Sequence, residues 1–175
     1  MINCMDGRKS ENIGNNIIVG VGEMAVSGDA GTKIKTYGLG SCVAVIVRDP
    51  ISGITGMVHV ALPDSNIDRG IAEERPGYFA NTGIPALINM MHDCGSTINT
   101  SKMIVKIAGG AQTLDENNVF EIGNRNVTAI KRILWMNNMS PVSADTGGHL
   151  SRTVLAYVSS GTVKIYDSSG NCREL

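Results

Sequence analysis

The residues best suited to chemistry are a cysteine and a histidine on either side of a predicted turn. Cys42 ends the motif GLGSC, and His59 lies in the motif VHVALP. A thiol is mostly protonated at neutral pH, but a neighbouring imidazole can take its proton and leave a thiolate–imidazolium pair. The pair therefore predicts nucleophilic thiol catalysis, provided that the fold brings the two side chains together.

The chain between these residues predicts a fold that does so. The segments CVAVIV and GMVHVA are apolar and β-rich, and the RDPISG between them contains turn signals, so we expect an antiparallel hairpin. If Pro50 and Ile51 are the central residues of the turn, Cys42 lies directly opposite His59. Directly opposed residues share a face, with Cβ atoms about 4.5–5.5 Å apart.

The residues around the pair suggest how it could be supported. The GLGSC motif lets the backbone approach a substrate and leaves N–H groups free for an oxyanion, from Gly38, Gly40 and Ser41. A catalytic histidine also needs a group that fixes its ring. There are three candidates: Thr36 on the strand before Cys42, Asp64 in the loop after His59, and Asp145.

A purely structural role is the alternative interpretation. A lone cysteine on a β-strand is commonly part of the core, and a histidine on an apolar strand is often a hydrogen-bonded structural residue. His149 lies in a glycine-rich loop, where it could line a site or simply be solvated. No set of His, Cys and Asp residues has metal-ligand spacing, so we expect neither a metal nor another cofactor.

Composition excludes several classes of protein. The chain has 175 residues, a formal net charge of −1 and no basic block, which argues against nucleic acid and against electrostatic membrane binding. Its longest apolar run, 42–47, is far too short for a membrane helix. The four scattered cysteines form no CxxC pair, and the polar start resembles no secretory signal, so we expect reduced thiols and a cytoplasmic protein.

The hydrophobic pattern predicts one α/β domain over 17–175 after a flexible polar leader, 1–16. The predicted strands cover 17–21, 33–37, 42–47, 56–61, 103–108, 153–158 and 163–166. The predicted helices cover 78–94 and 123–138, and 62–76 is predicted to be a long loop. This order indicates a layered sandwich with a largely antiparallel β core and two main helices.

Six sequence blocks together resemble one known family. GLGSC, VHVALPDS, PGYFA, KIAGGA, IGNRN and ADTGG occur in this order and span roughly residues 18–166. The chain is thereby similar to the CheD family, bacterial chemoreceptor glutamine deamidases. The resemblance implies a fold similar to the catalytic domain of the cytotoxic necrotizing factor toxins, and a Cys–His–Thr site made of Cys42, His59 and Thr36.

The resemblance also implies a substrate and partners. The expected reaction hydrolyses glutamine side chains in the cytoplasmic helical region of methyl-accepting chemotaxis receptors and releases ammonia. The phosphatase CheC is a further expected partner. Candidates for the substrate rim are Asp64, Ser65, Gly109, Gly110 and His149. Two alternatives remain at this stage: a non-catalytic adaptor that binds receptors or CheC, and another thiol acyl transferase, similar to a transglutaminase or a protease.

Overall fold

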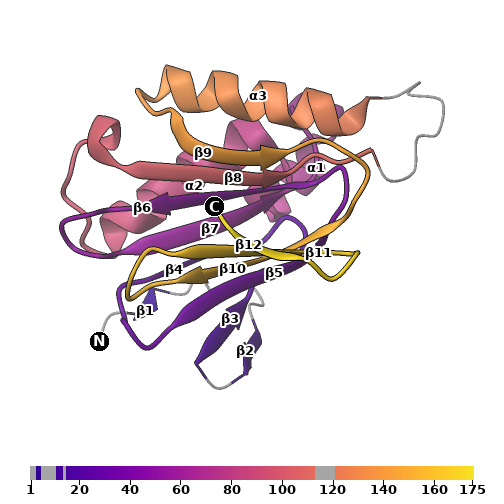
Figure 1. Cartoon of the computed structure of the whole chain (residues 1–175). Coiled ribbons are helices and arrows are strands. Elements are labelled where there is room, and N and C mark those ends of the chain that lie inside the picture. Colours follow the sequence, from indigo (N-terminus) through magenta and orange to yellow (C-terminus); the bar gives the residue numbers. More distant parts are fainter. Residues whose placement is uncertain (1–2, 5–10, 14, 113–120) are drawn as a thin grey trace.

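The strands form two six-stranded sheets in a computed structural model that describes residues 3–4, 11–13, 15–112 and 121–175 (Figure 1). The first sheet has the order β1-β4-β7-β6-β8-β9. Its strands are β1 (Asn3–Cys4), β4 (Met24–Ser27), β6 (Val43–Arg48), β7 (Thr55–Val60), β8 (Ile104–Gly109) and β9 (Pro141–Thr146). All pairings in this sheet are antiparallel except that of β8 with β9.

The second sheet has the order β12-β11-β10-β5-β3-β2, and only β3 and β5 pair in parallel. Its strands are β2 (Glu11–Ile13), β3 (Asn16–Ile18), β5 (Lys33–Leu39), β10 (Arg152–Tyr157), β11 (Val163–Asp167) and β12 (Cys172–Glu174). The prediction of a largely antiparallel β core is confirmed.

Two long helices, α2 (Ala80–Asp93) and α3 (Ile122–Met136), cover the outer face of the first sheet (Figure 1). Their apolar side chains and one face of the sheet form a helix-side core that contains Val43, Val45, Val47, Val58, Val60, Leu87, Ile130 and Leu134. The other face packs on the second sheet in an intersheet core that contains Ile34, Ala44, Ile46, Met57, Val154 and Ile165. The layers are thus helix, sheet and sheet, and β6 and β7 are covered on both faces.

The predicted hairpin is present as β6 and β7, but its predicted register is wrong by two positions. His59 pairs with Ala44 and not with Cys42. A shift of two residues keeps the same set of side chains on each face, because side chains alternate with a period of two. The alternate valines of β6, Val43, Val45 and Val47, accordingly lie together in the helix-side core.

The register differs because the turn is longer than predicted. Asp49 pairs with Ile54 through a backbone hydrogen bond of 2.9 Å, which leaves four residues in the connection. The Asp49 carboxylate accepts hydrogen bonds from the N–H groups of Ile51 and Ser52, at 2.8 and 3.2 Å. Gly53 closes the connection with φ of +77°, a value that favours glycine. The carboxylate thus stabilises a wider turn than one centred on Pro50.

The segment 62–76 was predicted to be a loop, and that prediction is wrong. It contains the short helices η1 (Ser65–Ile67) and α1 (Arg69–Glu74), followed by η2 (Pro76–Tyr78). Asp64 and Asp68 cap the first two helices, since their side chains accept from Asn66 N–H and Ile71 N–H. Aspartates at such positions satisfy helix N–H groups that lack a partner within the helix, which the apolar pattern alone does not reveal.

Four further elements were not predicted. They are the short helix η3 (Thr100–Lys102), the strands β4 and β9 at or near the margin of the first sheet, and the strand β12 at the edge of the second. In the predicted leader, 1–16, the described segments β1 and β2 pair with β4 and β3, whereas residues 1–2, 5–10 and 14 lie outside the described residues. No helix in the described ranges is long and apolar enough to cross a membrane.

Candidate active site

His59 lies near the C-terminal end of β7, with its side chain on the face that packs against the second sheet. Its neighbours along the strand, Val58 and Val60, belong to the helix-side core, so strand alternation turns His59 the opposite way. The residue is 2% exposed. Strand pairing on both sides, with β4 and β6, fixes its backbone. The backbone of this candidate base is therefore fixed by a strand that is paired on both sides.

Thr36 of β5 reaches this ring from the second sheet. Its Oγ1 lies 2.8 Å from His59 Nδ1 and 2.7 Å from the carbonyl oxygen of Val19. A carbonyl oxygen only accepts, so the single hydroxyl proton of Thr36 goes to Val19, and Thr36 must accept from His59 Nδ1–H. This chain of hydrogen bonds fixes the tautomer and leaves a lone pair on Nε2.

His59 Nε2 is buried and has no hydrogen-bond partner among the described residues. A buried nitrogen without a partner costs free energy, and such atoms are uncommon in native structures. The predicted approach of Thr36 to the ring is present, and the outcome is an unpaired basic nitrogen in a buried site. This is the feature expected of a base that awaits a proton.

Cys42 lies directly before β6, so it is not part of the strand as predicted. It is half-buried and packs against the intersheet core, the same layer that His59 faces. Its diagonal relation to His59 follows from the pairing of Ala44 with His59. Diagonal neighbours across a strand pair lie about 7–8 Å apart at Cα and remain within reach of long or aromatic side chains.

The surroundings of both side chains disfavour charge in the resting site. Burial raises the pKa of the Cys42 thiol, and a hydrogen bond from its own backbone N–H lowers it in part. Burial lowers the pKa of His59 from 6.5 to about 4, partly offset by the backbone of Val19. The expected ready thiolate–imidazolium pair is thus disfavoured before substrate binds, because both charged forms lose hydration.

Three successive carbonyl groups of the glycine loop around Cys42, those of Gly40, Ser41 and Cys42, accept hydrogen bonds from the chain after β8 and from α3. The Gly40 oxygen accepts from Ala111 N–H at 2.7 Å, and the Cys42 oxygen accepts from Gly110 N–H at 2.8 Å. The Ser41 oxygen accepts from Asn126 Nδ2 at 2.9 Å. No other described residue accepts from the N–H of Ser41 or Cys42. The loop therefore has carbonyls that are fixed and N–H groups that are available to a ligand.

Asn126 is a buried site neighbour that the sequence analysis missed. It lies on α3, is 0% exposed, and bonds Ala61 as well as Ser41. The sequence does contain a signal for it. Asn126 lies four residues before Ile130 and so falls on the apolar stripe of the predicted helix. A polar side chain on such a stripe needs a buried partner.

The other predicted site residues take different places. Asp64 and Ser65 form hydrogen bonds with Asn81 of α2. Asn81 Nδ2 donates to Asp64 Oδ1 at 3.2 Å and to Ser65 Oγ at 3.0 Å, and Asn81 Oδ1 accepts from Ser65 N–H at 2.9 Å. Gly109 and Gly110 are buried behind the Cys42 backbone rather than on an open rim. A Cβ on Gly109 would meet the Cys42 oxygen at 2.2 Å, so only glycine fits there.

Asp145 and His149 lie farther along the chain, in and after β9. Asp145 forms ion pairs with Arg152, at 2.9 Å, and with Arg173, and these guanidinium groups hold the pKa of its carboxyl below the usual range against the effect of burial. His149 is exposed, and its only described contact is Nδ1 at 3.5 Å from the Gln112 oxygen. Of the three orienting candidates, the structure brings only Thr36 to His59.

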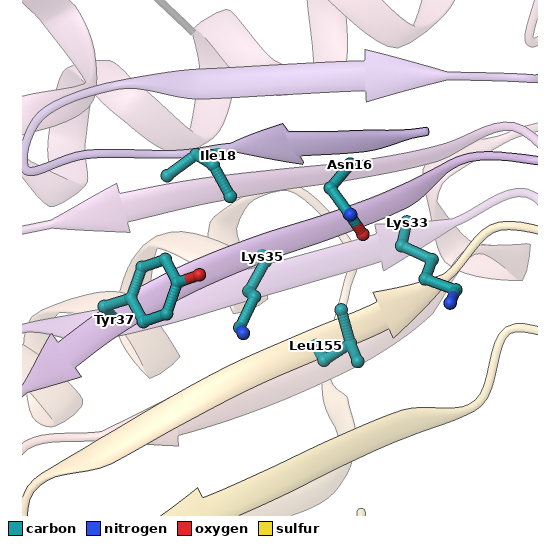
Figure 2. A pocket seen from close by; sticks show the side chains of 6 residues that line it. All are labelled: Asn16, Ile18, Lys33, Lys35, Tyr37 and Leu155. Atoms are coloured by element: carbon teal, nitrogen blue, oxygen red, sulfur yellow. The ribbon is translucent and has the colours of Figure 1, made fainter. Parts of the chain in front are cut away.

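A shallow pocket lies on the opposite face of the second sheet and is separate from these residues. Figure 2 shows the side chains that line it: Asn16, Ile18, Lys33, Lys35, Tyr37 and Leu155. Lys35 and Tyr37 alternate along β5 with Thr36, so they point away from the intersheet layer. Within the described ranges, no group of three or more His, Cys, Asp or Glu side chains could hold a metal ion.

An α/β sandwich that brings a thiol on a glycine loop, a buried imidazole and a hydroxyl to one layer has the geometry expected of a cysteine hydrolase. The comparisons with known proteins narrow this class. The family model of CheD chemotactic sensory transduction matches residues 61–167, and the chain belongs to the CheD family.

Curated relatives match a longer part of the chain than the family model does. The chain is 44% identical over 151 residues to a probable chemoreceptor glutamine deamidase CheD of Syntrophotalea carbinolica, covering 86% of this chain and 93% of the relative. It is 40% identical over 160 residues to a probable chemoreceptor glutamine deamidase CheD of Syntrophus aciditrophicus, covering 91% and 99%. It is 37% identical over 153 residues to the chemoreceptor glutamine deamidase CheD of Thermotoga maritima, covering 87% and 92%.

Proposed function

We propose that this protein is a chemoreceptor glutamine deamidase. It hydrolyses glutamine side chains of chemotaxis receptors to glutamate and releases ammonia. The observation that carries the proposal is the hydrogen-bonded chain from Val19 through Thr36 to His59, which leaves a buried, unpaired Nε2 toward the layer that Cys42 borders. The names of the relatives support the choice of substrate.

The proposed reaction begins with two neutral side chains. His59 Nε2 takes the thiol proton of Cys42 as the sulfur attacks the glutamine Cδ, so charge develops only in the transition state. The N–H groups of Ser41 and Cys42 hold the oxyanion. The carbon–nitrogen bond then breaks, and the imidazolium gives its proton to the departing ammonia. A thioester between Cys42 and the receptor side chain remains.

Hydrolysis of the thioester completes the cycle. His59 takes a proton from water as the water oxygen attacks the thioester carbon, and the returned proton restores the Cys42 thiol as the carbon–sulfur bond breaks. Thr36 and the Val19 carbonyl keep Nδ1 protonated throughout, so that Nε2 is always the nitrogen that exchanges protons. A carbonyl and a hydroxyl stabilise the imidazolium less than a carboxylate does, which suits transient protonation.

The test is mass spectrometry of a chemoreceptor cytoplasmic fragment after incubation with the protein. Conversion of glutamine to glutamate adds about one mass unit at a defined site, with no peptide cleavage and with release of ammonia. A non-catalytic adaptor leaves the fragment unchanged, a protease shortens it, and a transglutaminase attaches an added primary amine. Any of these three outcomes overturns the proposal.

Two finer expectations belong to the same proposal. The family resemblance supports a fold similar to the cytotoxic necrotizing factor catalytic domain, a cytoplasmic location and the phosphatase CheC as a partner. The rim residues Asp64, Ser65 and His149 stay candidates for substrate contact. Co-purification of this protein with a CheC-type phosphatase tests the partner, and the absence of any complex at micromolar concentrations contradicts it.

A further inference from the structure

Asn126 occupies an unusual place for an asparagine. It is fully buried on the face of α3 that otherwise carries Ile130 and Leu134 into the helix-side core. Burial of an amide is unfavourable unless its hydrogen bonds are made. Both Nδ2 protons are used, at 2.9 Å to the Ser41 oxygen and 2.8 Å to the Ala61 oxygen. Its Oδ1 has no partner in the described part of the chain.

The two carbonyls that Asn126 binds flank the proposed catalytic residues. Ser41 directly precedes Cys42, and Ala61, directly after β7, follows His59 by two residues. One amide group therefore spans the backbone that carries the nucleophile and the backbone that carries the base. A displacement of about 1 Å in such a geometry can cost about a hundredfold in rate.

The bond to Ser41 also sets the direction of the Cys42 N–H. The carbonyl of Ser41 and the N–H of Cys42 belong to one peptide group, and the described chain has no cis peptide bond. In a planar trans peptide these two groups point in opposite directions. Holding the oxygen against α3 therefore turns the N–H away from α3, toward the side on which no described residue other than Cys42 itself accepts from it.

We propose that Asn126 is a positioning residue for the deamidation: it orients the Ser41–Cys42 peptide so that the Cys42 N–H stabilises the substrate oxyanion, and it fixes this peptide relative to His59. The inference rests on the proposed function. Asn126 itself touches neither the thiol nor the ring in any described contact, so it acts through the backbone.

Helix packing alone does not provide this orientation. A Cβ on Gly123 would lie 2.3 Å from the Gly110 oxygen, so α3 already packs directly against the chain behind Cys42. That contact holds the helix in place but donates nothing to the Ser41 oxygen. Loss of the Asn126 amide therefore leaves the helix docked and the Ser41–Cys42 peptide less restrained.

The experiment compares N126A and N126D with L134A. N126D keeps the shape of the side chain but lacks the NH₂ group, and L134A removes a buried side chain of the same helix that belongs to the helix-side core. We expect kcat on a chemoreceptor fragment to fall about 10- to 100-fold in both Asn126 variants, with KM within about threefold. L134A should lose thermal stability but keep kcat within about threefold when folded.

A readout without substrate separates this inference from the proposed function. The amide ¹H–¹⁵N resonance of Cys42 should shift in N126A and N126D and stay in place in L134A. If wild-type protein does not deamidate, the function fails while the resonance still tests the orientation. Unchanged kcat in both Asn126 variants, or an equal loss of kcat in folded L134A, overturns the inference. An unshifted Cys42 resonance overturns it as well.

Discussion

His59 and Cys42 are positioned by different means, although their proposed chemistry is shared. His59 lies within a strand that is paired on both sides and covered on both faces, and its ring is held by a threonine from the other sheet. Cys42 lies outside the strands, on a loop whose carbonyls are bound by Gly110, Ala111 and Asn126. The proposed base is fixed by strand pairing and packing, and the proposed nucleophile is fixed by a few specific hydrogen bonds.

This difference indicates how each half of the site should fail. Removing a contact to the loop should change the approach of the thiol and leave the ring unaffected. Removing the contact to the ring should change its tautomer and leave the loop unaffected. Substitutions of the two side chains themselves set the upper limit of either effect.

The largest effect is expected from Cys42→Ala. Loss of a covalent nucleophile should lower deamidation more than about a thousandfold, because no other thiol shares the layer in the described structure. The fold should persist, since the substitution removes one sulfur from a half-buried loop. Ammonia release measures the loss of deamidation, and circular dichroism checks that the fold persists. Activity within tenfold of wild type contradicts a thiol nucleophile.

His59→Asn should lower turnover about 100- to 10,000-fold, because it removes both the acceptor of the thiol proton and the donor to ammonia. Steady-state rates on a receptor fragment measure the loss. Iodoacetamide modification of Cys42 is the matched control, and it should stay faster than that of buried Cys94. A variant that retains most of its turnover assigns the base elsewhere.

Thr36→Ala should cost about 10- to 100-fold in kcat, since orienting residues can be partly replaced by water or backbone groups. Thr36→Ser keeps the hydroxyl and should retain most activity. The ¹⁵N shifts of the His59 ring report the mechanism: wild type should carry its proton on Nδ1, and Thr36→Ala should show a mixture. A silent Thr36→Ala together with an inactive Asp145→Ala variant contradicts the assignment.

Acid should destabilise the protein through His59. Its folded pKa, about 4, lies below the ordinary 6.5, so the unfolded state binds the proton first as pH falls. The stability is fully present above pH 6.5 and declines toward pH 4, by about 3 kcal/mol in total for this group. Urea unfolding at several pH values should show a smaller decline for His59→Asn. Parallel curves for both proteins contradict a neutral buried imidazole.

The smallest effect is expected from Asp64→Ala. Asp64 caps a short helix and contacts Asn81, with no described contact to His59. We expect a slightly lower melting temperature and kcat within about twofold of wild type, because a cap stabilises local structure only. A large loss of kcat with unchanged melting gives Asp64 a catalytic role and weakens the case for Thr36.

Most of the fold was predictable because its periodic patterns are strong. Two apolar runs form β6 and β7, close to their predicted ranges. The apolar stripe of α3, with Ile130 and Leu134, is buried as its spacing indicates. Gly95 follows the end of α2, with φ of +100° and an N–H that donates to the His92 oxygen. What escaped prediction depends on single polar side chains: Asp49 sets the turn, and Asp68 caps α1.

The site was predictable to a similar depth. The face shared by Cys42 and His59 follows from strand alternation, and it survived the error in register because the shift was even. The contact of Thr36 with the ring needed a resemblance to a known family, because it joins two sheets. Asn126 was missed because a long-range hydrogen bond from a helix to a loop leaves no local pattern.

The central claim is that Cys42 carries the receptor side chain as a thioester. The direct measurement is acid quenching of the protein with a chemoreceptor fragment during turnover, followed by digestion and mass spectrometry of the adduct. The account predicts a receptor-derived acyl group, formed with loss of one ammonia, on the peptide that contains Cys42. It also predicts no adduct with the Cys42→Ala variant. An acyl group on any other residue, with Cys42 unmodified in the same sample, contradicts it.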